Sequence, residues 1–413
     1  MLRPLFVLGC VVPVILGIPL SEDEYEVNKT NFVFEDLDHL LAYVQTPTER
    51  VRNLGYVAEI HQVVTEDGYI LQMDRIVGSK SSHASDKKNP VLLIHGLLDT
   101  SAAWVLPCPE KGLGYILADQ GYDVWMGNVR GSRFSRRHVT LSTKDKDYWM
   151  FSWHEMGMFD IPAMIDYILT NTRKEKLYYV GHSQGSTSFF VMASEKPEYQ
   201  EKIIAAFTLA PAVFMSRATH PLIRLLTPHI NNAKILTDLI GMYEFKPSSS
   251  LVRTLSKIMC KDEMPTQPLC KTAFGIMGGR NDKDFNITLI PEIAQYDPAG
   301  ASTRQFVHYA QLCTSGNFAH YDHGLVGNLL NYGSIQPPKY NIANIKTPIY
   351  LYYGNNDEMV NVKDLEQLYE TLPNAQKFLV PYKWFAHLDF LWGMQAKNLV
   401  YDGILNLMAQ YKI

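Results

Sequence analysis

The sequence lacks most of the features that mark membrane, nucleic-acid-binding and zinc proteins. Its formal net charge is only −4 over 413 residues, so we expect no basic surface for nucleic acid or an anionic membrane. It contains 5 cysteines, and none lies in a C-x-x-C pair or a Cys/His cluster with zinc spacing. Beyond the N-terminus, no apolar run is long enough to span a bilayer. What is present is the composition of a globular chain with a large core, since 46% of the residues are hydrophobic.

Residues 1–17 are interpreted as a secretory signal peptide. Arg3 supplies a positive charge, an apolar stretch from Pro4 to Leu16 follows, and Gly17 is a small residue at the expected cleavage point. The stretch is too short to cross a bilayer, and an N-terminal anchor is the alternative. The sequence therefore predicts the secretory pathway, with the extracellular space or the lysosome as destination.

An oxidising compartment changes how the cysteines are interpreted. Cys10 leaves with the signal peptide, and an even number of cysteines remains. Cys260 and Cys270 close a short loop and are the predicted disulfide. Cys108 and Cys313 either pair with each other or stay as buried free thiols.

Two N-x-[ST] sequons begin at Asn28 and Asn286. In a secreted chain such asparagines are acceptors for glycans. Both are therefore predicted to be exposed and glycosylated.

Strands and helices alternate along most of the chain. A hairpin signal opens the pattern, with strands at residues 56–64 and 69–73 around Glu66-Asp67-Gly68. The later predicted strands are 90–94, 122–126, 177–180, 203–209, 348–354 and 377–380, and the predicted helices are 113–120, 155–170 and 187–194. This order predicts the α/β class, with a mostly parallel, doubly wound sheet and an antiparallel start.

The segment 214–340 does not show this alternation of strands and helices, and it is predicted to be an inserted helical cap. It divides the core into an N-terminal part, 18–213, and a C-terminal part, 341–413. The segment is rich in large apolar residues. They either form only the core of the cap, or, at about 245–272, build a lid over an acyl-binding cleft.

The most informative motif is Gly181-His182-Ser183-Gln184-Gly185. An apolar strand precedes it and a helix-compatible run follows, which is the context of a G-x-S-x-G nucleophile elbow. The sharp turn exposes the serine hydroxyl at the top of a sheet, where a substrate carbonyl can reach it. The motif therefore predicts Ser183 as the nucleophile.

A nucleophilic serine needs a base and an acid that orients the base. Asp357 directly follows the strand at 348–354, and it is the predicted acid, with Glu358 as the fallback. His387 follows the last strand and is the predicted base. Asp389, two residues later, is interpreted as a carboxylate of the local turn.

The oxyanion that forms during acyl transfer needs two backbone N–H donors. Gln184, next to the nucleophile at a helix N-terminus, is predicted to supply one. Leu97, in the loop after strand 90–94, is predicted to supply the other, with Gly96 permitting the turn. His95 and His182 are interpreted as structural residues of the wall.

These residues resemble the acid lipase family of gastric and lysosomal acid lipases. The resemblance covers residues 34–411 and rests on several motifs in order: His95-Gly96-Leu97, Asn128-Val129-Arg130-Gly131, Phe151-Ser152-Trp153-His154-Glu155-Met156, the elbow, Asp357 and His387-Leu388-Asp389-Phe390. The sequence at 153–156 is closer to that of insect members of the family.

The resemblance implies an α/β-hydrolase core with a cap and lid, and hydrolysis of lipid carboxylic esters without metal, cofactor or colipase. It places the nucleophile, acid and base on Ser183, Asp357 and His387, the oxyanion donors on Leu97 and Gln184, and the cap disulfide on Cys260 and Cys270. The predicted function is a secreted or lysosomal lipase that acts on triacylglycerols or sterol esters at a lipid–water interface, without an obligate protein partner. The alternatives are a hydrolase of smaller soluble esters and a non-catalytic lipid-binding protein on the same fold.

Overall fold

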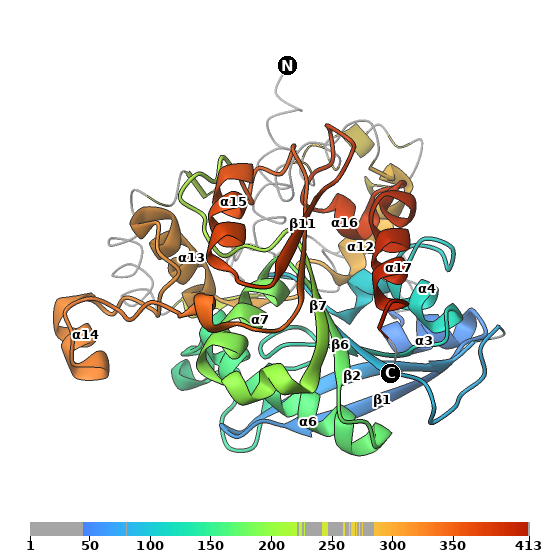
Figure 1. The fold of residues 1–413 in the computed structure, drawn as a ribbon, viewed down its shortest axis with the longest axis horizontal. Coiled ribbons are helices and arrows are strands. Elements are labelled where there is room, and N and C mark those ends of the chain that lie inside the picture. Colours follow the sequence, from blue (N-terminus) through green and yellow to red (C-terminus); the bar gives the residue numbers. More distant parts are fainter. Residues whose placement is uncertain are drawn as a thin grey trace, which may run out of the picture.

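The computed structural model describes residues 44–79, 81–220, 242–246 and 285–411, with a few further positions between 223 and 275. The predicted signal peptide, Asn28 and most of the predicted lid lie outside the described residues. Within the described part, a twisted nine-stranded sheet forms the centre of the molecule, and helices cover both of its faces (Figure 1). None of the described helices has the length and apolar content that a membrane crossing requires.

The sheet confirms the predicted α/β class. Its order is β1-β2-β4-β3-β6-β7-β10-β11, with β5 paired to β2. The pairs β1–β2 and β2–β4 are antiparallel, and every neighbouring pair from β4 to β11 is parallel. The strand bounds are β1 Val57–Val64, β2 Tyr69–Gly78, β3 Pro90–Ile94, β4 Asp123–Gly127, β5 Arg137–His138, β6 Leu177–His182, β7 Ile203–Leu209, β10 Ile349–Tyr353 and β11 Ala375–Leu379.

Helices connect the parallel strands and cover the sheet. Their bounds are α3 Pro47–Asn53, α4 Leu113–Asp119, α5 Trp153–Glu155, α6 Ile161–Thr172, α7 Gln184–Glu195, α12 Ile290–Tyr296, α13 Thr303–Ser315, α14 Gly324–Tyr332, α15 Val362–Thr371, α16 Asp389–Trp392 and α17 Asp402–Met408. A small second sheet pairs β8 Glu244–Phe245 with β9 Ala301–Ser302. The central strands β3, β4, β6, β7 and β10 are buried along their whole length, which explains their continuous apolar sequence.

The helix predicted at 155–170 is interrupted in the structure. A π-helical turn, η5 Met156–Asp160, separates α5 from α6. Pro162 supplies no N–H to the carbonyl four residues earlier, so the hydrogen-bond register changes just before it. The wide turn packs tightly on α7, because a Cβ on Gly157 would lie 2.6 Å from the Ser188 carbonyl oxygen.

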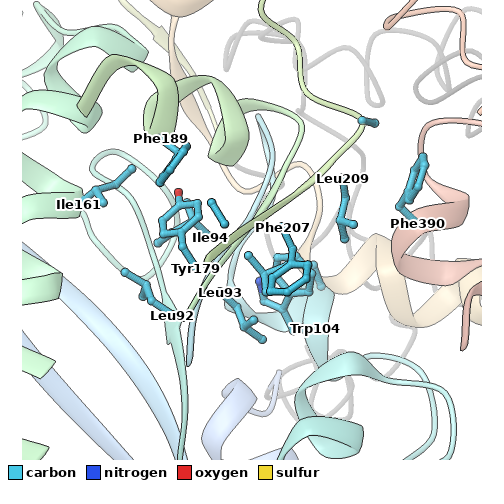
Figure 2. Close-up of a cluster of buried hydrophobic side chains, with 14 of the residues drawn as sticks. Leu92, Leu93, Ile94, Trp104, Ile161, Tyr179, Phe189, Phe207, Leu209 and Phe390 are labelled. Carbon is cyan, nitrogen blue, oxygen red and sulfur yellow. The ribbon is translucent and has the colours of Figure 1, made fainter. Parts of the chain in front are cut away.

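The hydrophobic core lies on both faces of β3 (Figure 2). Leu92 and Ile94 lie on the side of Tyr179, Phe189 and Ile161, whereas Leu93 faces Trp104 and Phe207. All of these side chains are buried, and each contributes roughly 1.5–3 kcal/mol when removed from water. This packing fixes the C-terminal ends of β3, β6 and β7, where the predicted site residues follow.

The cap boundaries at 214 and 340 remain predictions. Within the described part of this segment, Cys260 and Cys270 form a disulfide with a Cα–Cα distance of 5.7 Å. Cys108 and Cys313 are free, but Cys108 is exposed rather than buried.

Asn286 is half-buried, and its side-chain oxygen accepts hydrogen bonds from the Thr288 amide and hydroxyl. Its glycosylation remains a prediction.

Candidate active site

Ser183 stands between the end of β6 and the first residue of α7, in a strained conformation. Its backbone has φ 51° and ψ −114°, which costs a non-glycine residue about 1–3 kcal/mol. Hydrogen bonds hold it there. Its amide donates to the Leu209 carbonyl at 2.9 Å, and its own carbonyl accepts from the amides of Ser186 and Thr187 at 3.0 and 3.1 Å. The strand, turn and helix thus occur in the order that the motif predicts.

Glycines bring three backbone segments together around this turn. A Cβ on Gly185 would lie 2.2 Å from the Ile94 carbonyl oxygen, and one on Gly181 would lie 2.7 Å from the carbonyl carbon of Gly185. Neither position can carry a side chain without moving backbone. The turn therefore packs directly against the end of β3.

The loop after β3 passes beside Ser183, but Gly96 has a different role from the predicted one. The residue with left-handed backbone is Leu98, at φ 68°, whereas Gly96 does not have positive φ. A Cβ on Gly96 would lie 3.4 Å from Ser183 Cβ and 3.1 Å from His182 Nδ1. Gly96 is needed because the elbow approaches it closely, and the turn itself is made two residues later, where the Ala299 amide donates to the Leu98 carbonyl at 2.6 Å.

Asp357 and His387 are brought together by the loops after β10 and β11. The distance from Asp357 Oδ2 to His387 Nδ1 is 2.8 Å. Asp357 Oδ1 accepts from the amides of Met359 and Val360, both at 2.8 Å. An ionised carboxylate only accepts, so Nδ1 of His387 carries hydrogen and Nε2 is left as the basic nitrogen. Both side chains are buried.

The carboxylate that contacts the His387 ring is that of Asp357. The Glu358 carbonyl accepts hydrogen bonds from the amides of Thr219 and His220. Asp389 accepts from the Ala386 amide at 2.7 Å, so it stabilises the turn that carries His387, in agreement with its interpretation.

His182 links the His387 loop to the elbow. Its Nε2 lies 3.0 Å from the His387 carbonyl oxygen, and the two imidazole rings are 4.9 Å apart between centroids. Burial, and then the nearby His387, lower the pKa of His182 well below its usual value. A carbonyl only accepts, so neutral His182 donates from Nε2.

His95 is also a neutral wall residue. Burial lowers its pKa to about 4. Its Nδ1 donates to the Gly96 carbonyl at 2.8 Å, and its Nε2 accepts from the Val129 amide at 3.3 Å. Both ring nitrogens are therefore occupied, which leaves neither free to act as a base.

The two predicted oxyanion donors lie on the segments that meet at Ser183. Gln184 is the first residue of α7, where an amide has no partner within the helix and lies at the positive end of the dipole. Its side chain is directed at η5, with Nε2 3.5 Å from Met156 Sδ. Leu97 lies between Gly96 and Leu98 in the loop beside Ser183 and packs on the core.

One buried ion network was not predicted. Arg130 donates from Nε to Asp160 at 2.7 Å and from Nη1 and Nη2 to Asp67 at 2.5 and 2.8 Å. Its guanidinium lies 4.0 Å from the centre of the Tyr69 ring. The network fixes η5, which packs on α7. The motif Asn128-Val129-Arg130-Gly131 was the available signal, but the sequence does not show its partners.

Comparisons with known proteins show the family of the chain. Residues 89–393 match the family model described as alpha/beta hydrolase fold, and residues 47–107 match the partial alpha/beta-hydrolase lipase region. The chain is 42% identical to Lipase 3 of Drosophila melanogaster over 365 residues, covering 88% of this chain and 93% of the relative.

Two human relatives are also similar. The lysosomal acid lipase/cholesteryl ester hydrolase is 35% identical and covers 88% of this chain and 91% of its own. The gastric triacylglycerol lipase is 36% identical, and the match covers 87% of this chain and 89% of the relative. The chain belongs to the acid lipase family of α/β-hydrolases. The sequence identity of the chain is higher to the Drosophila relative than to the two human relatives, which agrees with the insect-like sequence at 153–156.

Among solved structures, a putative lipase from Sulfolobus solfataricus superposes on this acid lipase with a TM-score of 0.57 at 14% identity, covering 86% of this chain and 94% of the other. At that identity the likeness shows the shared fold alone.

Proposed function

We propose that this acid lipase hydrolyses carboxylic ester bonds of water-insoluble lipids, triacylglycerols or sterol esters, through an acyl-enzyme on Ser183. The observation that carries the proposal is the 2.8 Å contact between Asp357 and His387, on a loop that His182 holds against the strained serine. The names of the relatives support the substrate class, because they are a triacylglycerol lipase and a cholesteryl ester hydrolase.

The mechanism follows from the roles that these groups can take. His387 Nε2 accepts the Ser183 proton as Oγ attacks the ester carbonyl carbon, and Asp357 stabilises the imidazolium that forms. The amides of Leu97 and Gln184 stabilise the oxyanion, each by about 3 kcal/mol. His387 then returns the proton to the departing alcohol. Water attacks the acyl-enzyme by the same route, which releases the fatty acid and restores Ser183.

We also propose that the protein acts outside the cytosol, in the extracellular space or the lysosome. The signal-peptide pattern at 1–17 and the two sequons support this location. So do the disulfide at Cys260–Cys270 and the lysosomal and gastric names of the relatives.

A hydrolysis profile of triolein, cholesteryl oleate and p-nitrophenyl butyrate, from acid to neutral pH, tests the proposal. Turnover of a long-chain lipid ester is expected, with no turnover by Ser183→Ala. Activity confined to p-nitrophenyl butyrate would instead identify a hydrolase of small soluble esters. Failure of a fluorophosphonate probe to label Ser183, together with no turnover, would indicate a lipid-binding protein.

A further inference from the structure

Helix α14 stands on a stalk that leads away from the rest of the protein. The outgoing and returning segments of the stalk are joined by an antiparallel bridge between Ala319 and Lys339. The His320 amide also donates to the Pro338 carbonyl at 2.8 Å. In Figure 1, α14 lies at the far left, beyond α13 and apart from the central sheet.

The base of the stalk is anchored by packed aromatic rings. Phe318 on the outgoing segment and Tyr340 on the returning segment have ring centroids 4.5 Å apart. Trp153 of α5 stacks on Phe318 at 5.7 Å and on His308 of α13 at 3.7 Å. The stalk is therefore fixed to the core, so α14 is held out as a defined part of the fold.

The polarity of α14 is inverted relative to a surface helix of a soluble protein. Of its residues, all of which the structure describes, Asn328 is the one that is buried. The Asn328 amide donates to Asp322 Oδ1 at 2.8 Å and to the Ile335 carbonyl at 3.0 Å, and its oxygen accepts from the His323 amide at 2.9 Å. Polar contacts, together with the half-buried Tyr332 ring against the rings of His320 and His323, thus hold the inner side of the helix, where packing of aliphatic side chains is the usual arrangement.

The apolar side chains point outward instead. Four of them lie at helical spacing on one face, and the fifth, Ile335, comes after Gly333 and Ser334 beyond the end of the helix. Their exposed fractions lie between 46 and 82% for Leu325, Val326, Leu329, Leu330 and Ile335. Such a group of exposed apolar side chains, here called the α14 patch, is typical of an interaction surface.

The sequence around the patch carries no formal charge. Between Asp322 and Lys339 there is no Asp, Glu, Lys or Arg. Transfer of a charged group out of water is costly, so an uncharged projection can enter an apolar medium where a charged one cannot. A convex projection also suits a fluid surface, whereas a rigid protein partner would need a matching hollow.

From the inverted polarity, the missing charge and the projecting stalk, we infer that the α14 patch docks the enzyme onto a phosphatidylcholine-covered lipid surface by inserting Leu325, Leu329 and Leu330 among the lipid chains. The inference rests on the proposed function only in its choice of a lipid surface as the partner. Because the patch carries no charge, docking depends little on salt or on anionic lipid.

Flotation with phosphatidylcholine vesicles tests the inference. All proteins carry Ser183→Ala, so that the vesicles stay intact. Leu325→Asp/Leu330→Asp is expected to lower the vesicle-bound fraction by at least about tenfold, because two inserted leucines become charged. Leu330→Trp is expected to raise it. Addition of phosphatidylserine or of salt is expected to change flotation of the Ser183→Ala parent by less than about twofold.

The matched control is Val57→Asp/Val64→Asp, which places the same charges at two exposed aliphatic positions on β1. It should float like the parent. In a background with Ser183 intact, both double variants should hydrolyse p-nitrophenyl butyrate at the wild-type rate, which separates docking from chemistry. A wild type that hydrolyses none of triolein, cholesteryl oleate and p-nitrophenyl butyrate would contradict the proposed function and leave the flotation result standing.

Equal flotation of Leu325→Asp/Leu330→Asp and its parent would overturn the inference. So would sedimentation velocity that shows a wild-type dimer which Leu330→Asp dissociates, because the patch would then be an interface between two copies of the chain.

Discussion

His182 Nε2 lies 3.0 Å from the carbonyl oxygen of His387, although 205 positions separate the two residues in the chain. Since His182 is the neighbour of Ser183, this bond ties the loop of the proposed base to the elbow of the proposed nucleophile. His182 is neutral and buried, so it acts on His387 by fixing its backbone. Asp357 fixes the same residue through its ring. The imidazole is thus oriented from two sides.

Replacement of His182 by Phe is expected to lower kcat for p-nitrophenyl butyrate by about tenfold with little change in KM. The variant keeps a ring but removes the donor, which leaves the His387 carbonyl unpaired at a cost of roughly 1–3 kcal/mol. Steady-state kinetics with the soluble ester measures the effect without the lipid interface. An unchanged kcat would show that Asp357 alone is sufficient to place the imidazole.

Two substitutions of Ser183 separate chemistry from backbone strain. Ser183→Ala and Ser183→Gly both remove the hydroxyl, and turnover is expected to fall by more than about a thousandfold in each. Glycine tolerates φ 51° and ψ −114° better than alanine, so Ser183→Gly should be more stable than Ser183→Ala by about 1 kcal/mol. Thermal unfolding checks this. Equal melting temperatures would mean that the elbow stores little strain.

Asp357→Asn is expected to lower kcat by about 10⁴, because the amide donates to His387 Nδ1 and selects the wrong tautomer. Glu358→Gln serves as the matched control and should stay within about threefold of wild type. The Glu358 carbonyl accepts hydrogen bonds from two amides of the part of the chain that the structure describes, and the substitution leaves that carbonyl in place. A larger loss in Glu358→Gln than in Asp357→Asn would reassign the acid.

The parts that could be predicted from the sequence are those with local signals. Continuous apolar runs identified the buried strands, and glycines on both sides of Ser183 identified a turn that admits no side chain at either position. Asp357 and His387 were predicted to lie together because parallel strands place their C-terminal ends at one edge of the sheet, and the structure brings their side chains into contact. These inferences needed only chain order and strand ends.

The rest depends on contacts between distant segments, which no local pattern reveals. Arg130 meets Asp67 and Asp160 only after three segments have packed. The contact of His182 with His387 is of the same kind. The turn after β3 was assigned to Gly96 because glycine favours positive φ, but Leu98 adopts it. Here tertiary packing, including the Ala299 hydrogen bond, overrides the intrinsic preference.

A buried pair of carboxyl groups next to that turn should make stability depend on pH. Burial raises the pKa of Asp99 to about 7, and burial together with Asp99 raises the pKa of Asp297 well above its usual value. In the unfolded chain an aspartate titrates near pH 4 (about 3.9). Between about pH 4 and pH 7 the folded state therefore binds more protons than the unfolded state, so stability falls as pH rises through this window.

Asp99→Asn should flatten this loss, because the amide stays neutral while its oxygen can still accept from the Thr100 amide. Its stability at pH 7.5 is expected to exceed that of the wild type by an amount of the order of 2 kcal/mol, with a smaller difference at pH 4.5. Thermal unfolding at the two pH values measures this, and Asp86→Asn, at an exposed position, is the control. A wild-type protein that becomes more stable from pH 4.5 to 7.5, with Asp99→Asn following the same slope, would show that the pair does not take up protons on folding.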